Sequence, residues 1–211
     1  MNENLLREQI AELGKSLYDR GLAHGSAGNI SAKLADGDWL LTPTNSCLGR
    51  LDPAKISRLD GNGKLVSGDP PSKESFLHLA MYQERATSGA VVHLHSLHAV
   101  AVSCLADIDP ADVFPPITAY AIMQVGKLAL VPYYPPGDQS LADAVRKLAG
   151  THQAVLLANH GPVVAGTTLN AAVNAIEELE QTAHLLLLLQ GRPTRLLNAA
   201  QVAELNRRFP N

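Results

Sequence analysis

A short apolar segment that carries two histidines in alternation constrains the fold more than any other part of the chain. Residues 90–95 read Ala-Val-Val-His-Leu-His, and such a run predicts a buried strand over 90–94. Alternate side chains of a strand share one face, so His93 and His95 project to the same side, where they can bind one metal ion. For a bare His-x-His pair, two histidines satisfied by ordinary hydrogen bonds are an alternative of equal weight.

Helical and extended patterns alternate along the rest of the chain. Apolar spacing predicts helices over residues 5–20, 72–86, 97–106, 139–149 and 169–190. Further strands are predicted over 30–34, 38–41, 128–132, 154–158 and 162–165, the first two as a hairpin around Asp36-Gly37. The turn cluster at 60–63 predicts another antiparallel pairing at 64–66. We therefore expect one α/β (α+β) domain over residues 1–211, with a mixed sheet.

Composition excludes several classes of protein. Of the 211 residues, 46% are hydrophobic and 18% are charged, which is typical of a globular domain and not of a disordered or coiled-coil chain. The formal net charge of −3 leaves no basic surplus for binding nucleic acid. The unbroken apolar runs are too short for a membrane span. The polar start, MNENLLREQI, and two isolated cysteines predict a cytoplasmic protein with reduced thiols.

A third histidine stands where another predicted strand ends. His160 follows the apolar segment 154–158 and precedes Gly161, and polar residues at such positions are common in functional sites. Taken singly, His160 is more typical of a structural residue. With His93 and His95 it completes a three-histidine set that leaves coordination positions open, as catalytic zinc sites do. Structural roles are predicted for the histidines without a comparable setting, which are His24, His98, His152 and His184.

Glu74 lies at the start of the helix predicted over 72–86, for which Ser72 is the expected cap. A carboxylate at this position commonly complements the positive end of the helix dipole. His78 follows four residues later on the same helix face, so the pair can instead extend a metal or proton-transfer site. A histidine satisfied within the core is the more common interpretation of His78.

Two loops of small residues, 25–29 and 42–46, are candidates for binding a phosphate group. They contain Gly, Ser, Thr and Asn, whose backbone N–H groups and side chains donate hydrogen bonds without a net positive charge. Neither loop matches a nucleotide-binding fingerprint, because the chain contains no G-x-x-x-x-G-K-S/T and no G-x-G-x-x-G sequence. Considered alone, each loop is compatible with an ordinary turn.

Five spaced motifs together resemble the class II aldolase family, which includes L-fuculose-phosphate aldolase and L-ribulose-phosphate 4-epimerase. The resemblance extends from the first helix to about residue 190 and rests on Gly28-Asn29-Ile30-Ser31, Thr42-Pro43-Thr44, Ser72-Lys73-Glu74, His93-Leu94-His95 and His160-Gly161. It implies a three-layer α/β/α fold with a mainly antiparallel mixed sheet, and a homotetramer with sites at subunit boundaries. It also implies one divalent metal ion per chain, most commonly Zn2+, held by His93, His95 and His160.

The resemblance implies roles for further residues. Glu74 occupies the position of the catalytic acid/base, and three residues match phosphate contacts, namely Asn29, Thr44 and Ser72. The aldolases use a tyrosine as proton donor, and Tyr120 is the nearest candidate in this sequence. A half-buried structural tyrosine is the alternative for that position.

Two departures from fuculose-phosphate aldolase fall in or near the implied phosphate pocket, since Asn45 replaces a glycine and Lys73 replaces a serine. The segment 42–53, together with Pro-Ser-Lys-Glu at 71–74, is more similar to the 3-oxo-tetronate 4-phosphate decarboxylase branch of the family. This similarity implies a phosphorylated sugar acid as the substrate. Lys73, next to Glu74, is a candidate for binding the substrate carboxylate, with a solvated surface lysine as the common alternative.

The implied reaction is loss of carbon dioxide from a 3-oxo-tetronate 4-phosphate, which gives dihydroxyacetone phosphate through a metal-stabilised enediolate. The same charge stabilisation serves aldol cleavage, so a sugar-phosphate aldolase is the first alternative, followed by an epimerase or a dehydratase. A metal or sugar-phosphate binding protein is the alternative outside the enzymes. The presence of Glu74 beside three potential ligands argues against it, since binding alone needs no acid/base.

Overall fold

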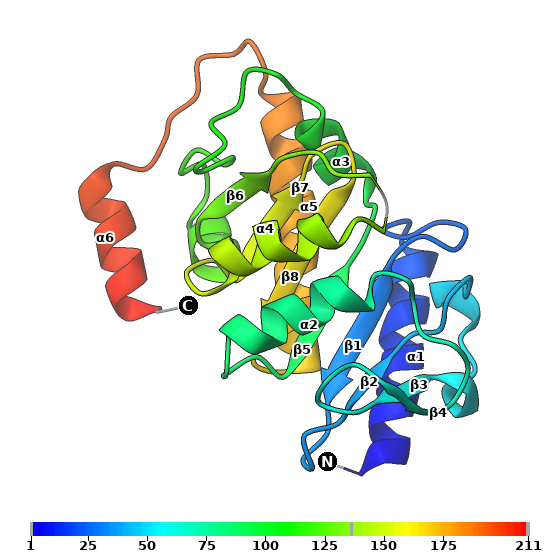
Figure 1. Cartoon of the computed structure of the whole chain (residues 1–211). Helices are drawn as coiled ribbons and strands as arrows, with labels where there is room; N and C mark the ends of the chain where they lie inside the picture. The colour runs from blue at the N-terminus through cyan, green and yellow to red at the C-terminus, as the bar shows by residue number, and fades with distance from the viewer. Residues whose placement is uncertain (1, 136, 210–211) are drawn as a thin grey trace.

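Eight strands form one open sheet in the computed structural model, which describes residues 2–135 and 137–209 (Figure 1). The spatial order is β4-β3-β2-β1-β5-β8-β7-β6, and neighbouring strands are antiparallel except for the parallel pair β6 and β7. The strands are β1 (Asn29–Lys33), β2 (Trp39–Leu41), β3 (Ser57–Leu59), β4 (Leu65–Ser67), β5 (Ala90–His93), β6 (Leu128–Val131), β7 (Ala154–Leu157) and β8 (Gly161–Gly166). The predicted mixed, mainly antiparallel sheet is confirmed.

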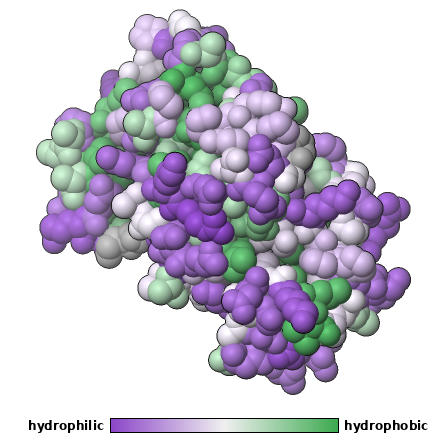
Figure 2. All heavy atoms as spheres, in the orientation of Figure 1, coloured by the Kyte–Doolittle hydropathy of each residue, from purple (hydrophilic) through white to green (hydrophobic). Residues whose placement is uncertain are grey.

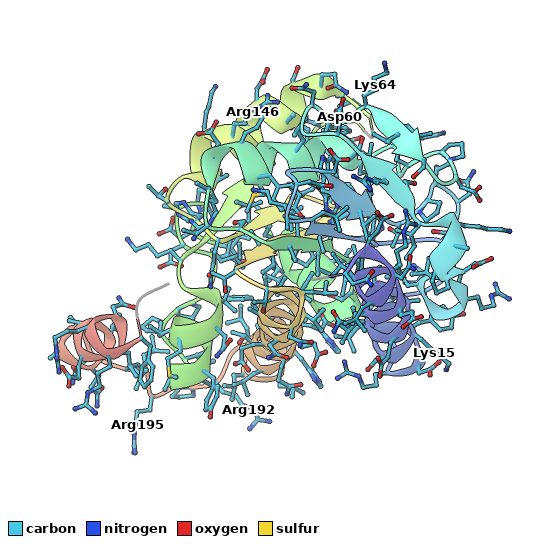
Figure 3. The ribbon with its side chains drawn as sticks, turned by 90° about the horizontal axis from the view of Figure 1, so that it is seen from below. Lys15, Asp60, Lys64, Arg146, Arg192 and Arg195 are labelled. Atoms are coloured by element: carbon cyan, nitrogen blue, oxygen red, sulfur yellow. The ribbon has the colours of Figure 1, made fainter. Side chains whose placement is uncertain are left out.

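Helices cover both faces of this sheet, as the view in Figure 3 shows. One face is covered by α1 (Glu3–Asp19), α3 (Leu97–Ser103) and α5 (Leu169–Leu188), and the other by α2 (Ser75–Glu84) and α4 (Gln139–Ala149). The remaining helical segments are η1 (Leu48–Arg50), η2 (Pro53–Lys55), the π-helical turn η3 (Ala121–Val125) and α6 (Ala199–Arg208). The arrangement is the three-layer α/β/α fold that the family resemblance implies.

The sheet separates two hydrophobic cores, because the side chains of each strand alternate between its faces. On β5, Val92 belongs to the core that contains Ile10 of α1 and Ile176 of α5. Val91 belongs to the opposite core, together with Leu77 of α2. Each of these side chains is fully buried, which stabilises the fold by roughly 1.5–3 kcal/mol per residue. The same alternation places the next residue of β5, a histidine, on the side of α2.

Helix α2 begins three residues later than predicted. Residues 70–72 are extended, because the N–H of Ser72 donates to the carbonyl oxygen of Thr42 (3.2 Å) and the N–H of Thr44 donates to that of Pro70 (2.9 Å). The prediction that Ser72 caps this helix is therefore wrong. Glu74 occupies the cap position instead. The pairing also brings the loop 42–46 beside Ser72.

Other differences from the predicted elements are local. The helix predicted over 97–106 ends at Ser103, whose carbonyl oxygen accepts a hydrogen bond from the N–H of Asn159 (3.3 Å). The sequence patterns identified neither β3 nor α6. The other predicted helices and strands are present, with ends shifted by up to about two residues, the usual uncertainty of such boundaries.

Polar side chains cover the outside of the layers. Lys15, Asp60 and Arg146 point away from the sheet in Figure 3, and hydrophilic residues predominate on the face shown in Figure 2. Of the helices in the described part of the chain, none has the length and apolar character needed to cross a membrane.

Candidate metal centre and its cleft

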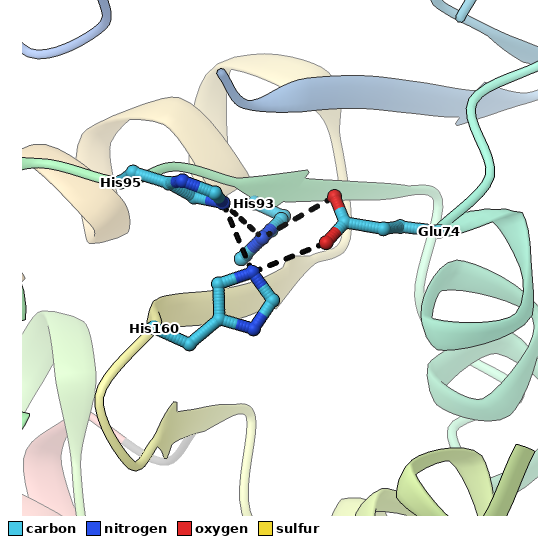
Figure 4. Close-up of side chains that lie close together, drawn as sticks. All are labelled: Glu74, His93, His95 and His160. Carbon is cyan, nitrogen blue, oxygen red and sulfur yellow. Dashed lines mark hydrogen bonds and ion pairs between the residues drawn. The ribbon is translucent and has the colours of Figure 1, made fainter. Parts of the chain in front are cut away.

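Four side chains of types that bind metals converge at the end of β5 (Figure 4). The Nε2 atom of His95 lies 3.1 Å from that of His93 and 3.0 Å from that of His160. Glu74 approaches from the start of α2, with its Oε1 3.1 Å from His160 Nε2 and its Oε2 3.5 Å from His93 Nε2. The structure thus brings together the three predicted ligands and the predicted acid/base, and we call these four residues the cluster.

The sheet fixes the position and orientation of His93. This residue ends β5, between Asn29 of β1 and Val163 of β8. Its side chain is fully buried, and its Nδ1 lies 2.8 Å from the carbonyl oxygen of Pro162. Because a carbonyl oxygen only accepts, Nδ1 carries a proton, and Nε2 is the ring atom turned toward the cluster.

His160 reaches the cluster from the turn between β7 and β8. Asn159 has a left-handed φ of 55°, and the N–H of His160 donates to the carbonyl oxygen of Leu157 (3.1 Å). Gly161 follows with a φ of 153°, and a Cβ atom at this position would collide with the carbonyl oxygen of Leu94. Glycine is therefore required for β8 to begin so close to the end of β5.

Burial and neighbouring charges control protonation in the cluster. Burial, together with the charges of His93 and His160, lowers the pKa of His95 to about 3. Burial by itself would raise the pKa of Glu74. The charge of His93, and the hydrogen bonds that the Glu74 carboxylate accepts from His160, His93 and Asn29, outweigh burial. Together they hold the pKa of Glu74 well below its usual value. Near neutral pH, His95 is neutral and Glu74 is ionised.

This donor set fits a divalent metal ion. Imidazole nitrogens bind Zn2+ at about 2.0–2.1 Å, so two of them on a tetrahedral ion lie about 3.3 Å apart. The Nε2 separations of 3.0 and 3.1 Å in the cluster are close to this value. The three rings meet edge to face, with centroids 4.6–4.9 Å apart, so their nitrogen atoms converge on one point. The carboxylate of Glu74 supplies negative charge at the same point.

Asn29 and Ser72, two of the predicted phosphate contacts, lie next to Glu74. Asn29 Nδ2 donates to Glu74 Oε2 at 2.7 Å and lies 3.2 Å from Ser72 Oγ. The Ser72 hydroxyl oxygen accepts a hydrogen bond from the backbone N–H of Glu74 (3.3 Å). Both residues therefore hold Glu74 in place in the structure.

Thr44 and Asn45 line a separate pocket of about 350 Å³. Asn45 has a left-handed φ of 56°, a conformation that asparagine adopts more readily than most residues. Two cations, Arg50 and Lys55, and two carboxylates, Asp52 and Asp69, line the same pocket beside the uncharged donors. The loop motif does not predict Arg50 and Lys55, because these residues lie outside it and are brought to the pocket by η1 and η2.

A cleft of about 750 Å³ opens onto the cluster. Glu74, His95 and His160 line it, together with Gly21, His24, Leu97, Val100, Tyr133, Tyr134 and Asn159. A purely structural role was predicted for His24, and neither of the two adjacent tyrosines was singled out. No local motif could have identified these residues, since they come from loops that meet at the cleft only in the folded chain.

Tyr120 and Lys73 lie elsewhere. Tyr120 immediately precedes η3 and is 63% exposed, and it is not among the described residues that line the cleft of its own chain. It is therefore not the half-buried tyrosine of the structural alternative. Lys73 is exposed, and among the described residues it likewise does not line the cleft. Contact between Lys73 and a substrate carboxylate stays a prediction.

The remaining histidines make contacts away from the cluster. His98 Nδ1 lies 2.8 Å from a carboxylate oxygen of Glu180, and the His98 ring stacks on His184 with centroids 3.9 Å apart. His152 Nδ1 lies 2.9 Å from Thr151 Oγ1. These contacts are compatible with the structural roles predicted for the three histidines.

Comparison with known proteins relates the sequence and the fold of this chain to one described family. Residues 8–187 match the family model described as the Class II Aldolase and Adducin N-terminal domain. The chain belongs to the class II aldolase family. Family members named 3-oxo-tetronate 4-phosphate decarboxylase are 50% identical in Escherichia coli (203 residues, 96% of both chains) and 45% identical in Haemophilus influenzae (208 residues, 99% of both chains). L-fuculose phosphate aldolase of Escherichia coli is 35% identical over 189 residues, which cover 89% of this chain and 85% of the aldolase.

Solved class II aldolase structures share the fold. YgbL from Escherichia coli has a TM-score of 0.95 at 49% identity, over 96% of this chain and 98% of YgbL. An L-fuculose 1-phosphate aldolase has a TM-score of 0.85 at 28% identity, over 97% of this chain and 96% of the aldolase. The predicted family and its decarboxylase branch are both confirmed by these relatives.

Proposed function

We propose that this class II aldolase is a metal-dependent carboxy-lyase that converts a 3-oxo-tetronate 4-phosphate into dihydroxyacetone phosphate and carbon dioxide. The observation that carries the proposal is 45–50% identity to named decarboxylases over nearly the whole chain, in a protein that retains a complete cluster. A carbon–carbon lyase is also the activity for which class II aldolases are named.

The reaction needs a place for negative charge and a source of one proton. Cleavage of the bond between C1 and C2 releases carbon dioxide and leaves the electron pair on C2, from which it is delocalised onto the C3 ketone oxygen. A proton delivered to C2 then gives dihydroxyacetone phosphate. A divalent ion, when bound, supplies Lewis-acid stabilisation of negative charge on substrate oxygens.

The residues of the cluster divide these tasks. His93, His95 and His160 would hold the ion through their Nε2 atoms, and Zn2+, one per chain, is proposed because a borderline-soft imidazole site suits it. Glu74 lines the cleft, where its ionised carboxylate can take a proton from water and pass it to C2. The hydrogen bond from Asn29 keeps one carboxylate oxygen of Glu74 in place for this exchange.

The substrate phosphate is assigned to Asn29, Thr44, Asn45 and Ser72. Support comes from the backbone pairing between residues 42–44 and 70–72, which brings two of the predicted motifs together. Arg50 and Lys55 line the pocket beside Thr44 and Asn45 and can each pair with a phosphate oxygen, while Asp52 and Asp69 balance their charge.

We expect Thr44→Ala to lower kcat/KM for the phosphorylated substrate, because its hydroxyl is assigned a hydrogen bond to a charged phosphate. Such a bond contributes about 1.5–3 kcal/mol, or roughly a ten- to hundredfold effect on kcat/KM. Steady-state kinetics and metal analysis check this, and the metal content is expected to be unchanged. Thr151→Ala, at an exposed threonine after α4, is the matched control. An unchanged kcat/KM in Thr44→Ala would refute the phosphate assignment.

A comparison of two reactions tests the proposed activity. Given a 3-oxo-tetronate 4-phosphate, the metal-loaded protein is expected to release carbon dioxide and dihydroxyacetone phosphate in equal amounts. This rate should exceed, by about tenfold or more, the rate of condensation of dihydroxyacetone phosphate with lactaldehyde. Because 3-oxo acids also lose carbon dioxide spontaneously, the same mixture without protein is the required control.

Aldol cleavage is the second candidate, because L-fuculose phosphate aldolase is 35% identical to this chain. Efficient condensation without release of carbon dioxide would overturn the decarboxylase proposal in favour of the aldolase. The assignment of the cluster as the metal centre would stand in either case, since both reactions place negative charge on substrate oxygens.

Tyr120 is assigned as a proton donor that acts at the site of a neighbouring subunit. Its side chain is exposed and does not line the described cleft of its own chain, so a role in the reaction requires a second copy. This assignment accords with the homotetramer, with sites at subunit boundaries, that the family resemblance implies.

Mixing two inactive variants tests the shared site. His95→Ala and Tyr120→Phe chains, unfolded and refolded together, are expected to regain up to about a quarter of the parent activity, because random assembly pairs an intact cluster with an intact neighbouring tyrosine in that fraction of sites. Each variant refolded alone is the control. If both residues acted within one chain, the mixture would stay inactive.

A further inference from the structure

A network of buried polar side chains leads from Tyr82, in the last part of α2, to Glu74. The Tyr82 hydroxyl lies 2.7 Å from the Ser31 hydroxyl, which lies 2.7 Å from His78 Nδ1. His78 Nε2 is hydrogen-bonded to Asn29 Oδ1, and Asn29 Nδ2 lies 2.7 Å from Glu74 Oε2. Exposure is 0% for Ser31 and His78, 3% for Asn29 and 6% for Tyr82. We call these four residues the His78 network.

Strand and helix geometry explain why the network forms. Asn29 and Ser31 are alternate residues of β1, so they share the face toward α2 and lie about 6.6 Å apart along the strand. His78 and Tyr82 are four residues apart on α2, which is about 6 Å along the helix axis. The two spacings match closely enough for each helix residue to meet a strand residue.

The direction of every hydrogen bond in the network follows from the carboxylate of Glu74, at which the network ends. An ionised carboxylate only accepts, so Asn29 turns its amide nitrogen toward Glu74 and its Oδ1 toward His78. Because Oδ1 also only accepts, Nε2 of His78 carries the ring proton. Burial lowers the pKa of His78 to about 3, so the ring is neutral and its Nδ1 accepts from the Ser31 hydroxyl. The oxygen of Ser31 then accepts from the hydroxyl of Tyr82.

We propose that His78 is a positioning residue, which fixes the amide of Asn29 and, through it, the carboxylate of Glu74 in the orientation that proton exchange requires. The proposal rests on the proposed role of Glu74 in the reaction. His78 itself belongs neither to the cluster nor to the described residues that line the cleft.

The asymmetry of an amide group gives His78 this influence. A side-chain amide has nearly the same shape after a half-turn, which exchanges its oxygen and nitrogen atoms. In the wrong orientation, Asn29 would place Oδ1 against a negative oxygen of Glu74, and its amide nitrogen would face the N–H of His78. The ring proton on Nε2 of His78 therefore favours one orientation of Asn29, and the Ser31 hydroxyl can donate to the Nδ1 that is left without a proton.

The tautomer of His78 can be measured in the unaltered protein. Nitrogen-15 NMR of histidine-labelled, zinc-loaded protein distinguishes the two neutral forms of each ring, and the signals missing in His78→Gln identify His78. We expect the neutral form protonated on Nε2. The form protonated on Nδ1, or a charged ring, would overturn the proposal whatever reaction the protein catalyses.

A double-mutant cycle tests whether His78 acts through Asn29. His78→Leu is expected to lower kcat by about ten- to hundredfold with KM within about threefold, because it removes the donor that orients the amide. In an Asn29→Ala background, the same substitution should lower kcat by less than about twofold further. Equal effects in both backgrounds would show that His78 contributes only to general packing, and would overturn the proposal.

Rescue by a conservative variant completes the test. Glutamine can place an amide N–H near the position of the imidazole Nε2–H, so His78→Gln is expected to keep kcat within about fivefold of the parent. A kcat as low as that of His78→Leu would contradict the positioning role. His152→Leu, at a histidine outside both the network and the cluster, is the matched control, and thermal unfolding is measured for every variant.

Discussion

The His95→Ala variant is expected to lose both its metal ion and its activity. The Nε2 of His95 lies within 3.1 Å of both other imidazole nitrogens, so its removal leaves two histidines on opposite sides of a gap. Two imidazoles and a carboxylate bind zinc less tightly than the full set, and the cleft admits water to the vacated position. We expect kcat to fall by about a thousandfold or more, since the reaction loses its stabilisation of negative charge.

Elemental analysis of protein purified without chelators measures the first effect, and release of dihydroxyacetone phosphate measures the second. His152→Ala, which changes a histidine outside the cluster, should retain about one ion per chain and parent activity. A His95→Ala protein with a full equivalent of metal and normal turnover would show that the cluster is not the catalytic metal centre.

The Glu74→Gln variant is expected to separate metal binding from turnover. Glutamine keeps the size of the side chain but removes its charge and its ability to exchange a proton, so kcat should fall by about a hundred- to ten-thousandfold. The three imidazoles remain, so the metal content should stay near one equivalent. The pair of measurements that checks this is elemental analysis and steady-state kinetics on the same sample.

Glu84→Gln is the matched control, because it makes the same substitution at the exposed far end of α2. It should leave kcat unchanged. If Glu74→Gln retained parent turnover, the acid/base role would have to pass to another group, and the positioning role of His78 would lose its basis.

The sequence predicted the parts of the candidate site that depend on local geometry. Strand alternation favoured His93 and His95 on one side, although β5 ends at His93, and His160 was singled out only because it completes a three-histidine set with them. The identity of the fourth residue, Glu74, came from the family resemblance, since its position at a helix start is equally typical of a carboxylate that serves the helix dipole.

The parts that could not be predicted depend on segments that meet only in the folded chain. Ser72 looked like a helix cap, but backbone pairing of residues 70–72 with residues 42–44 keeps it extended. The interpretation of His78 as a satisfied core histidine agrees with its two hydrogen bonds, yet its partner Asn29 lies 49 residues away in sequence. Pairing of β1 with β5 and α2 creates that contact, and no short motif encodes it.

The close passage of β8 over the end of β5 explains why a glycine stands directly after the third histidine. The two residues are needed for different reasons. The imidazole of His160 belongs to the cluster, whereas the absence of a side chain at Gly161 leaves room for the carbonyl oxygen of Leu94. A substitution of His160 would therefore remove a member of the cluster, whereas a substitution of Gly161 would cause a steric clash. A related chain that did not bind a metal ion could do without the histidine, but it would still need the glycine to form this sheet.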